Sequence, residues 1–243
     1  GQEVWVRENN PIFNWLQLLN TGVRIPAVAN TDAHTNYHGS GGRRNYVRSP
    51  TDDPRKIDPL EIVRSAARGH LVMTNGPFLE VTLRLADIGG AGSVAIPGDE
   101  IAAPGGRVII KARVECPNWI DIDRVHLLLN GRADVKRGWT RYNDPHQFDD
   151  GPVKFDSEID LTLERDTHVI VVAWHKVKML AAIMGPEWGD FHPTAISNPI
   201  FVDVDGGGFT ANGDTLGHPL PVKGGLVVPG PPGPAPPVRP AKK

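Results

Sequence analysis

The chain of 243 residues contains a single cysteine, Cys116, and this scarcity limits its covalent and metal chemistry. One cysteine cannot form an internal disulfide, so the sequence excludes both a disulfide framework and a cysteine-based zinc knuckle. The compartment stays open, because a bacterial periplasmic protein can also lack disulfides. The sequence likewise contains no P-loop, dinucleotide fingerprint or Gly-x-Ser-x-Gly elbow.

Long apolar runs and an excess of charge of one sign are also missing. No apolar stretch approaches the about 20 residues that cross a bilayer, and the opening GQEVWVRENN lacks the pattern of a signal peptide. The 26 basic and 28 acidic residues are intermixed and give a formal charge of −2, so no basic stripe is available to neutralise phosphates. We expect a soluble globular protein with no membrane span and no nucleic-acid partner.

The first third of the chain alternates helical and apolar segments, as α/β folds do. Apolar residues at helical spacing predict a helix over residues 11–21, and the apolar run RIPAVAN at 24–30 predicts a buried strand. Asp58 as N-cap and Glu61 as the partner in a capping box predict a second helix over 59–68. Ligands of α/β folds gather at the C-terminal ends of strands, so the polar loop after RIPAVAN is a candidate site.

Beyond residue 78 the sequence changes to short alternating strands without helices. RVIIKARVE, at 107–115, alternates apolar and charged residues, and similar runs follow in DRVHLLLN, FDSEIDLTL and THVIVVAWH. This pattern predicts an antiparallel β-sandwich of immunoglobulin-like type over residues 79–206. DVDGGG at 203–208 lacks the ligands of an EF-hand and predicts a turn. The proline-rich, basic residues 207–243 predict a disordered tail.

The stretch VANTDAHTNYHGS, residues 28–40, carries two candidate metal ligands. Asp32 and His34 stand one residue apart, so on an extended segment their side chains point the same way and can converge on one ion. A carboxylate and an imidazole suit zinc, manganese or iron. The alternative is a turn capped by Asp32 with a solvated His34, and the spacing by itself favours this alternative.

Four further residues are candidates for substrate binding. His38 lies beside a run of glycines and is either a substrate contact or a surface loop residue. Arg43 and Arg44 could clamp a phosphate or carboxylate group, and being solvated is the alternative for both. Asn75 begins the tight turn Asn-Gly-Pro, where it could line a pocket or serve only the turn.

Four separated stretches, taken in order, resemble the C-terminal half of CehA/McbA-like metallohydrolases, a branch of the polymerase and histidinol phosphatase (PHP) superfamily. They are LLNTGVRIPAVANTDAH, RRNYV, EIVRSAARGHLVMTNGPFLEV and ISNPIFVDVDG. The resemblance implies a distorted β/α barrel with two or three divalent metals at the C-terminal ends of its strands. It also implies hydrolysis of phosphoesters or carbamate-type bonds by metal-bound hydroxide. The last metal motif of the family, Asp-x-His, maps onto Asp32 and His34.

The sequence departs from the family because it contains no His-x-His pair, with which the family's site begins. We therefore expect that Gly1 is not the natural start. On this basis residues 1–78 are the C-terminal portion of a PHP-like barrel, 79–206 the β-sandwich and 207–243 the tail. The expected partners are the missing N-terminal half of the barrel and, in the intact enzyme, a small-molecule substrate.

Two ligands cannot hold a divalent ion by themselves, so we expect the metal site to be incomplete and the chain alone to be inactive. Which residues are catalytic stays open. The alternative function is a non-catalytic binding or structural β-sandwich module that carries an orphaned barrel remnant. A third alternative is an intact small protein in which the Asp-x-His loop binds nothing.

Overall fold

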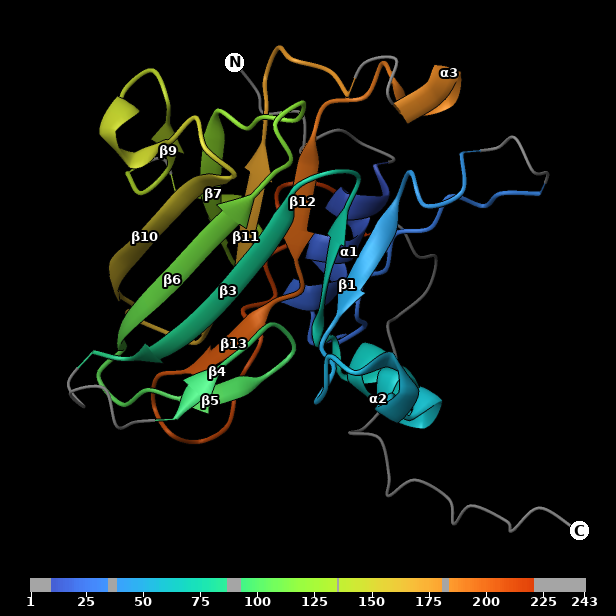
Figure 1. The fold of residues 1–243 in the computed structure, drawn as a ribbon. Coiled ribbons are helices and arrows are strands. Elements are labelled where there is room, and N and C mark those ends of the chain that lie inside the picture. Colours follow the sequence, from blue (N-terminus) through green and yellow to red (C-terminus); the bar gives the residue numbers. More distant parts are fainter. Residues whose placement is uncertain (1–9, 35–38, 87–92, 135, 181–183, 221–243) are drawn as a thin grey trace, which may run out of the picture.

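The structure, a computed structural model, describes residues 10–34, 39–86, 93–134, 136–180 and 184–220 (Figure 1). The described chain is mostly β: two sheets pack face to face, and the helix α1 (Pro11–Asn20) covers the outer face of the larger sheet. Two short helices lie outside these layers, α2 (Pro59–Arg68) and α3 (Gly185–Trp188). Single 3-10 turns occur at Pro54–Lys56 and Pro145–Gln147.

The larger sheet has nine strands in the order β1-β2-β12-β11-β13-β5, with β7, β8 and β9 attached through β7. Its central strand, β11, pairs with β12 and β13 in succession along one edge and with β7 along the other. All its pairs are antiparallel except β13 with β5. The strands are β1 (Arg44–Val47), β2 (Leu71–Thr74), β5 (Glu100–Ala102), β7 (Arg124–Leu129), β8 (Arg132–Ala133), β9 (Trp139–Thr140), β11 (Thr167–Trp174), β12 (Thr194–Ser197) and β13 (Ile200–Asp203).

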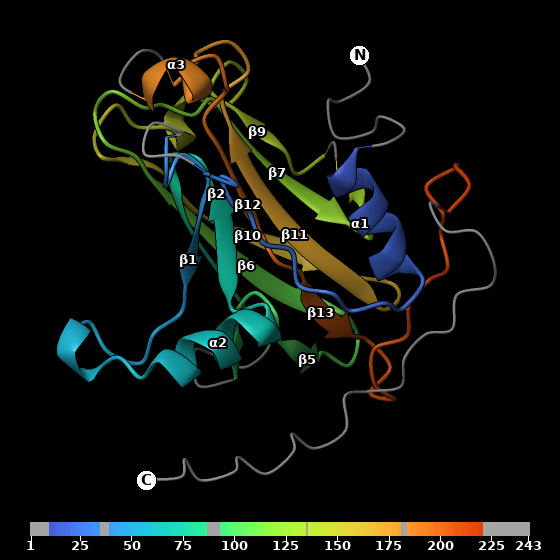
Figure 2. The same cartoon turned by 90° about the vertical axis from the view of Figure 1, so that its right-hand side faces the viewer.

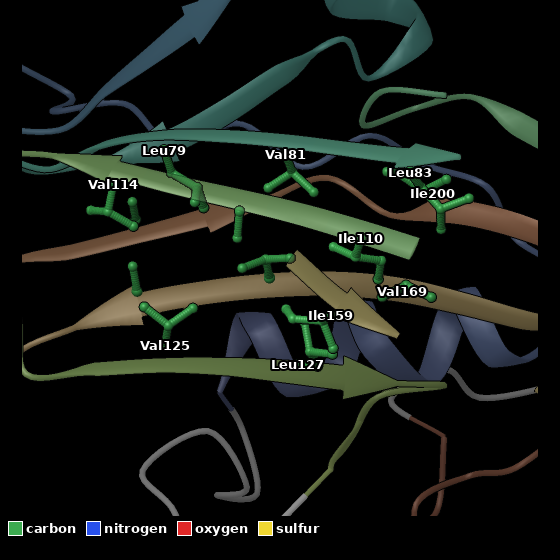
Figure 3. Close-up of a cluster of buried hydrophobic side chains, with 14 of the residues drawn as sticks. Leu79, Val81, Leu83, Ile110, Val114, Val125, Leu127, Ile159, Val169 and Ile200 are labelled. Atoms are coloured by element: carbon green, nitrogen blue, oxygen red, sulfur yellow. The ribbon is translucent and has the colours of Figure 1, made fainter. Parts of the chain in front are cut away.

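The smaller sheet has four antiparallel strands in the order β10-β6-β3-β4. They are β3 (Phe78–Leu85), β4 (Val94–Ala95), β6 (Arg107–Glu115) and β10 (Val153–Thr162). The alternation predicted for residues 107–115 is confirmed, because Val108, Ile110, Ala112 and Val114 are all fully buried. Figure 3 shows side chains of β3 and β6 meeting those of β7 and β11, and these residues form the main core.

The central strand β11 is buried on both faces, which explains its continuous apolar sequence THVIVVAW. Val169 and Val171 belong to the core between the sheets, whereas Ile170 and Val172 contact α1. The predicted helix 11–21 is confirmed as α1, whose first turn is capped by the side chain of Asn10. Figure 2 shows α1 lying along this sheet.

The run RIPAVAN at residues 24–30 does not form the buried strand that the sequence predicts. It is extended, yet Ile25 and Val28 are 53% and 54% exposed. In the described part of the chain no strand pairs with it, and the side-chain amides of Asn45 and Asn198 bond its backbone instead. This apolar run therefore leaves side chains exposed to solvent that its composition predicts to be buried.

The second predicted helix is confirmed as α2, which begins after the Asp58 cap and ends at a left-handed Gly69. Glu61 pairs with Arg64, so its carboxylate does not reach back as the predicted capping box requires. No residue of α2 is buried, and its leucine and valine side chains, Leu60 and Val63, are 53% and 63% exposed. Like the run at 24–30, this amphipathic helix leaves apolar side chains uncovered.

The two sheets span the boundary expected between residues 78 and 79, since β2 pairs with β12. Residues 209–220, in the predicted tail, form turns beside α1, where the amide of Gln17 donates to the carbonyls of Thr215 and His218 at 2.7 and 3.0 Å. Residues 221–243 lie outside the described residues. None of the helices described is long and apolar enough to cross a membrane.

Candidate functional site

The predicted ligand pair, Asp32 and His34, lies at the end of the extended segment that follows α1. Asp32 Oδ1 and His34 Nε2 are 3.9 Å apart, and the two side chains are 93% and 73% exposed. Asp32 adopts a φ of 52°, a left-handed conformation that aspartate tolerates better than most residues. Both atoms could bind one ion, because twice a metal–ligand distance of about 2.1 Å exceeds their separation.

Among the described residues, no third histidine, cysteine, aspartate or glutamate joins this pair in a cluster of three. His38, the other histidine of the loop, lies outside the described residues. Zinc sites in proteins use three or four protein ligands. The pair therefore has the chemistry of part of a metal site, and the described residues do not complete it.

Arg43 lies over two aromatic rings from a distant part of the chain, with its guanidinium carbon 4.7 Å from the Trp188 ring centre and 5.0 Å from that of Phe191. The indole N–H of Trp188 donates to the carbonyl of Gly39 at 3.1 Å. A Cβ at Gly39 or Gly42 would overlap the indole, so both glycines allow the loop to lie on this ring. Residues 39–43 are thus held against the segment around α3.

Arg44 and Asn75 both bond to backbone near this loop. Arg44 donates to the carbonyls of Gly41 and Gly76 at 3.2 and 3.1 Å. The amide of Asn75 donates to the carbonyl of His192 at 2.8 Å and accepts from the backbone N–H at the start of β12 at 2.7 Å. Because both ends of the Asn75 amide are engaged by backbone, its observed contacts are those of the architectural alternative.

A cluster of acids forms where the sequence predicts a turn, at DVDGGG. The carboxylates of Asp166, Asp203 and Asp205 lie within 4.8 Å of one another, and oxygen ligands of this kind suit hard cations such as calcium. Asp203 accepts backbone N–H bonds from Gly206 and Gly208 at 2.7 and 2.9 Å. Burial raises the pKa of Asp203, but these bonds outweigh it and hold the pKa below its ordinary value. The predicted turn is confirmed, and backbone donors satisfy its central carboxylate.

A cavity of about 530 Å³ lies at the C-terminal end of α2, and the sequence did not predict it. His70 and Asp99 meet in its wall, with Nε2 and Oδ1 2.9 Å apart. Arg24 and Arg68 also line the cavity. Its residues come from separate segments of the chain, so no local pattern marks it.

Two buried titratable groups are held in their neutral forms. Burial raises the pKa of the Cys116 thiol to about 12, which removes the thiolate that nucleophilic catalysis would need. Burial also lowers the pKa of His168 to about 4. Both groups belong to the packed interior.

No family model, no curated protein and no solved structure matches this chain. Of the predicted site residues, Asp32 and His34 lie side by side, whereas Arg43, Arg44 and Asn75 connect the neighbouring loops.

Proposed function

We propose that this chain is the C-terminal portion of a metal-dependent hydrolase, and that Asp32 and His34 supply one pair of ligands to a site completed by residues outside the chain. The proposal starts from the resemblance to CehA/McbA-like metallohydrolases of the PHP superfamily. The observation that carries it is the 3.9 Å approach of a carboxylate oxygen and an imidazole nitrogen at the exposed end of an extended segment.

Uncovered apolar side chains in the first third of the chain support the proposal. Ile25 and Val28 on the extended run, and Leu60 and Val63 on α2, are each more than half exposed. In a β/α barrel a strand lies between two neighbours, and helices cover the barrel with their apolar faces. In this proposal residues 1–78, with α1, the run at 24–30, β1, α2 and β2, are the remnant of a PHP-type barrel, and the strands after residue 78 form the immunoglobulin-like sandwich, whose larger sheet β1 and β2 extend.

The chemistry of the pair suits zinc, manganese or iron, with Asp32 contributing a charged oxygen and His34 a neutral nitrogen. A divalent ion in a completed site would supply a water of lowered pKa and would stabilise negative charge on the substrate. The substrate class is a phosphoester or a carbamate or amide. With two ligands only, the chain by itself would bind metal weakly and be inactive.

Metal analysis of the complete gene product that contains this chain tests the proposal. Bound zinc, manganese and iron are measured by mass spectrometry, and phosphodiester and carbamate hydrolysis are assayed in parallel. We expect Asp32→Ala and His34→Ala each to weaken metal binding by more than about tenfold and to abolish hydrolysis. Asp52→Ala and His146→Ala replace exposed residues of the same two types and should leave both unchanged.

Full metal content and full activity in both ligand variants would refute the assignment. Absence of metal and of hydrolysis in the complete gene product would favour the alternative, a non-catalytic β-sandwich module. Folding of each variant is checked by its thermal unfolding transition, since exposed side chains at these positions contribute little to stability.

A further inference from the structure

The cavity at the end of α2 lies beside the end of the β1–β2 pair at which Val47 faces Leu71, and it shares no residue with the ligand pair. Its walls are residues 24–26, the last turn of α2 with Gly69 and His70, the turn leading into β5, and residues 198, 199 and 201. Figure 2 shows α2, β5 and β13 gathered at one end of the molecule, with α3 at the other. Its volume of about 530 Å³ is in the range of small-molecule sites.

Both carboxylates in the wall are already engaged at each oxygen. Asp99 Oδ1 lies 2.9 Å from His70 Nε2, and its Oδ2 accepts the backbone N–H of Ile96 at 2.9 Å. Glu100 Oε2 accepts from Arg24 at 2.6 Å, and its Oε1 accepts a backbone N–H from the segment after β13 at 2.8 Å. A ligand that enters the cavity therefore meets few free acceptors among these acids.

Of the two arginines in the wall, Arg24 is engaged by Glu100, whereas Arg68 is not engaged by any described residue. Arg68 lines the cavity and makes no hydrogen bond or ion pair with any described residue. Because Nε2 of His70 donates to Asp99, Nδ1 of the neutral ring is an acceptor, and His70 adds no free donor to the cavity. Guanidinium groups bind carboxylate and phosphate through paired N–H bonds, so the uncommitted chemistry of this cavity is that of an anion site.

The wall that carries Arg68 is held rigidly. Gly98 has a φ of 95°, its N–H donates to the carbonyl of Pro199 at 2.7 Å, and a Cβ there would overlap the carbonyl of Arg68. Together with the His70–Asp99 pair, this close approach fastens the turn before β5 to the end of α2. This structural role explains the bond between His70 Nε2 and Asp99, but it does not involve the side chain of Arg68.

Much of the remaining lining is apolar, although Asn198 also contributes to it. Leu19, Ile25, Pro26, Pro199 and Phe201 form the apolar part of the lining. We propose that the cavity binds a small organic anion, whose carboxylate or phosphate pairs with the guanidinium of Arg68 and whose apolar body lies against Ile25 and Pro26. The site is independent of the metal pair, because none of its residues is shared with Asp32 or His34.

Titration of the protein with benzoate, phenyl phosphate and benzamide, followed by ¹⁵N amide chemical shifts, tests the inference. Benzoate and phenyl phosphate carry the two anionic heads, and benzamide has the shape of benzoate without its charge. We expect saturable shifts for Gly69, His70 and Gly98 with at least one anion, and binding of benzamide at least about tenfold weaker.

Variants of two arginines on the same helix locate the effect. Arg68→Gln should weaken binding of the anion at least about tenfold, whereas Arg64→Gln, one turn earlier, paired with Glu61 and outside the cavity, should leave it unchanged. Arg68 is exposed, so the variant is expected to fold, and the remaining amide signals verify this. Absence of saturable shifts here with both anions, equal binding of benzamide, or unchanged binding in Arg68→Gln would each overturn the proposal.

Discussion

Lowering the pH should destabilise this protein through His168, whose imidazole is fully buried on the α1 side of β11. Its Nε2 lies 2.8 Å from Asn20 Oδ1, and its buried Nδ1 has no partner among the described residues. The amide of Asn20 is oriented because its nitrogen donates to the carbonyls of Asn130 and Asp214. This orientation assigns the proton to Nε2, and a second proton on Nδ1 would find no acceptor.

The magnitude follows from the pKa of His168, which burial lowers from 6.5 to about 4. Between these two values the unfolded chain binds more protons than the folded one, so stability falls as the pH falls. The stability that the protein gains from a neutral His168 is fully present above pH 6.5 and is lost by pH 4. At about 1.4 kcal/mol for each pKa unit, the loss is about 3 kcal/mol, a large share of a typical domain stability of about 5–15 kcal/mol.

Urea unfolding followed by tryptophan fluorescence, repeated between pH 7.5 and 4.5, measures this loss. His168→Gln retains a donor for Asn20 but does not titrate, so it should show a smaller decrease in the free energy of unfolding than the unsubstituted protein. Comparing the two cancels the contributions of other titrating groups. His146→Gln, at an exposed position, should behave like the unsubstituted protein. If the free energy of unfolding of the unsubstituted protein and that of His168→Gln fall equally with pH, His168 is not the cause of the loss.

Two further substitutions test contacts around the predicted site. Gly42→Ala places a methyl group in the Trp188 indole, so we expect a loss of about 1–3 kcal/mol in the free energy of unfolding and a shift of the tryptophan emission. Gly151→Ala meets only ordinary contacts and should change stability by less than about 0.5 kcal/mol. Asn75→Ala leaves the backbone N–H of Thr194 unpaired at the start of β12, whereas the His192 carbonyl keeps the Thr194 hydroxyl, and the substitution should cost about 1–3 kcal/mol in urea unfolding. An unchanged stability would show that this amide does not hold the strand.

The helices and strands that were predicted correctly are those whose signals are local. The Asp58 cap and the left-handed Gly69 delimit α2, and the alternation in β6 separates its buried and exposed faces. The prediction of a buried strand at 24–30 was wrong. The apolar composition of this run favours burial, but burial also requires neighbouring segments, and the composition does not indicate which segments lie beside it. In the described structure two asparagine side chains take the place of a neighbouring strand.

The same distinction applies to the candidate sites. Asp32 and His34 are separated by one residue, so the sequence by itself keeps the two side chains close together, although Asp32 is left-handed and not extended as the prediction assumed. Only the tertiary structure placed Trp188 under the glycine loop, isolated His168 from solvent and assembled the cavity beside α2. Each of these depends on segments far apart in the chain, and side-chain spacing carries no information about which distant surfaces will pack together.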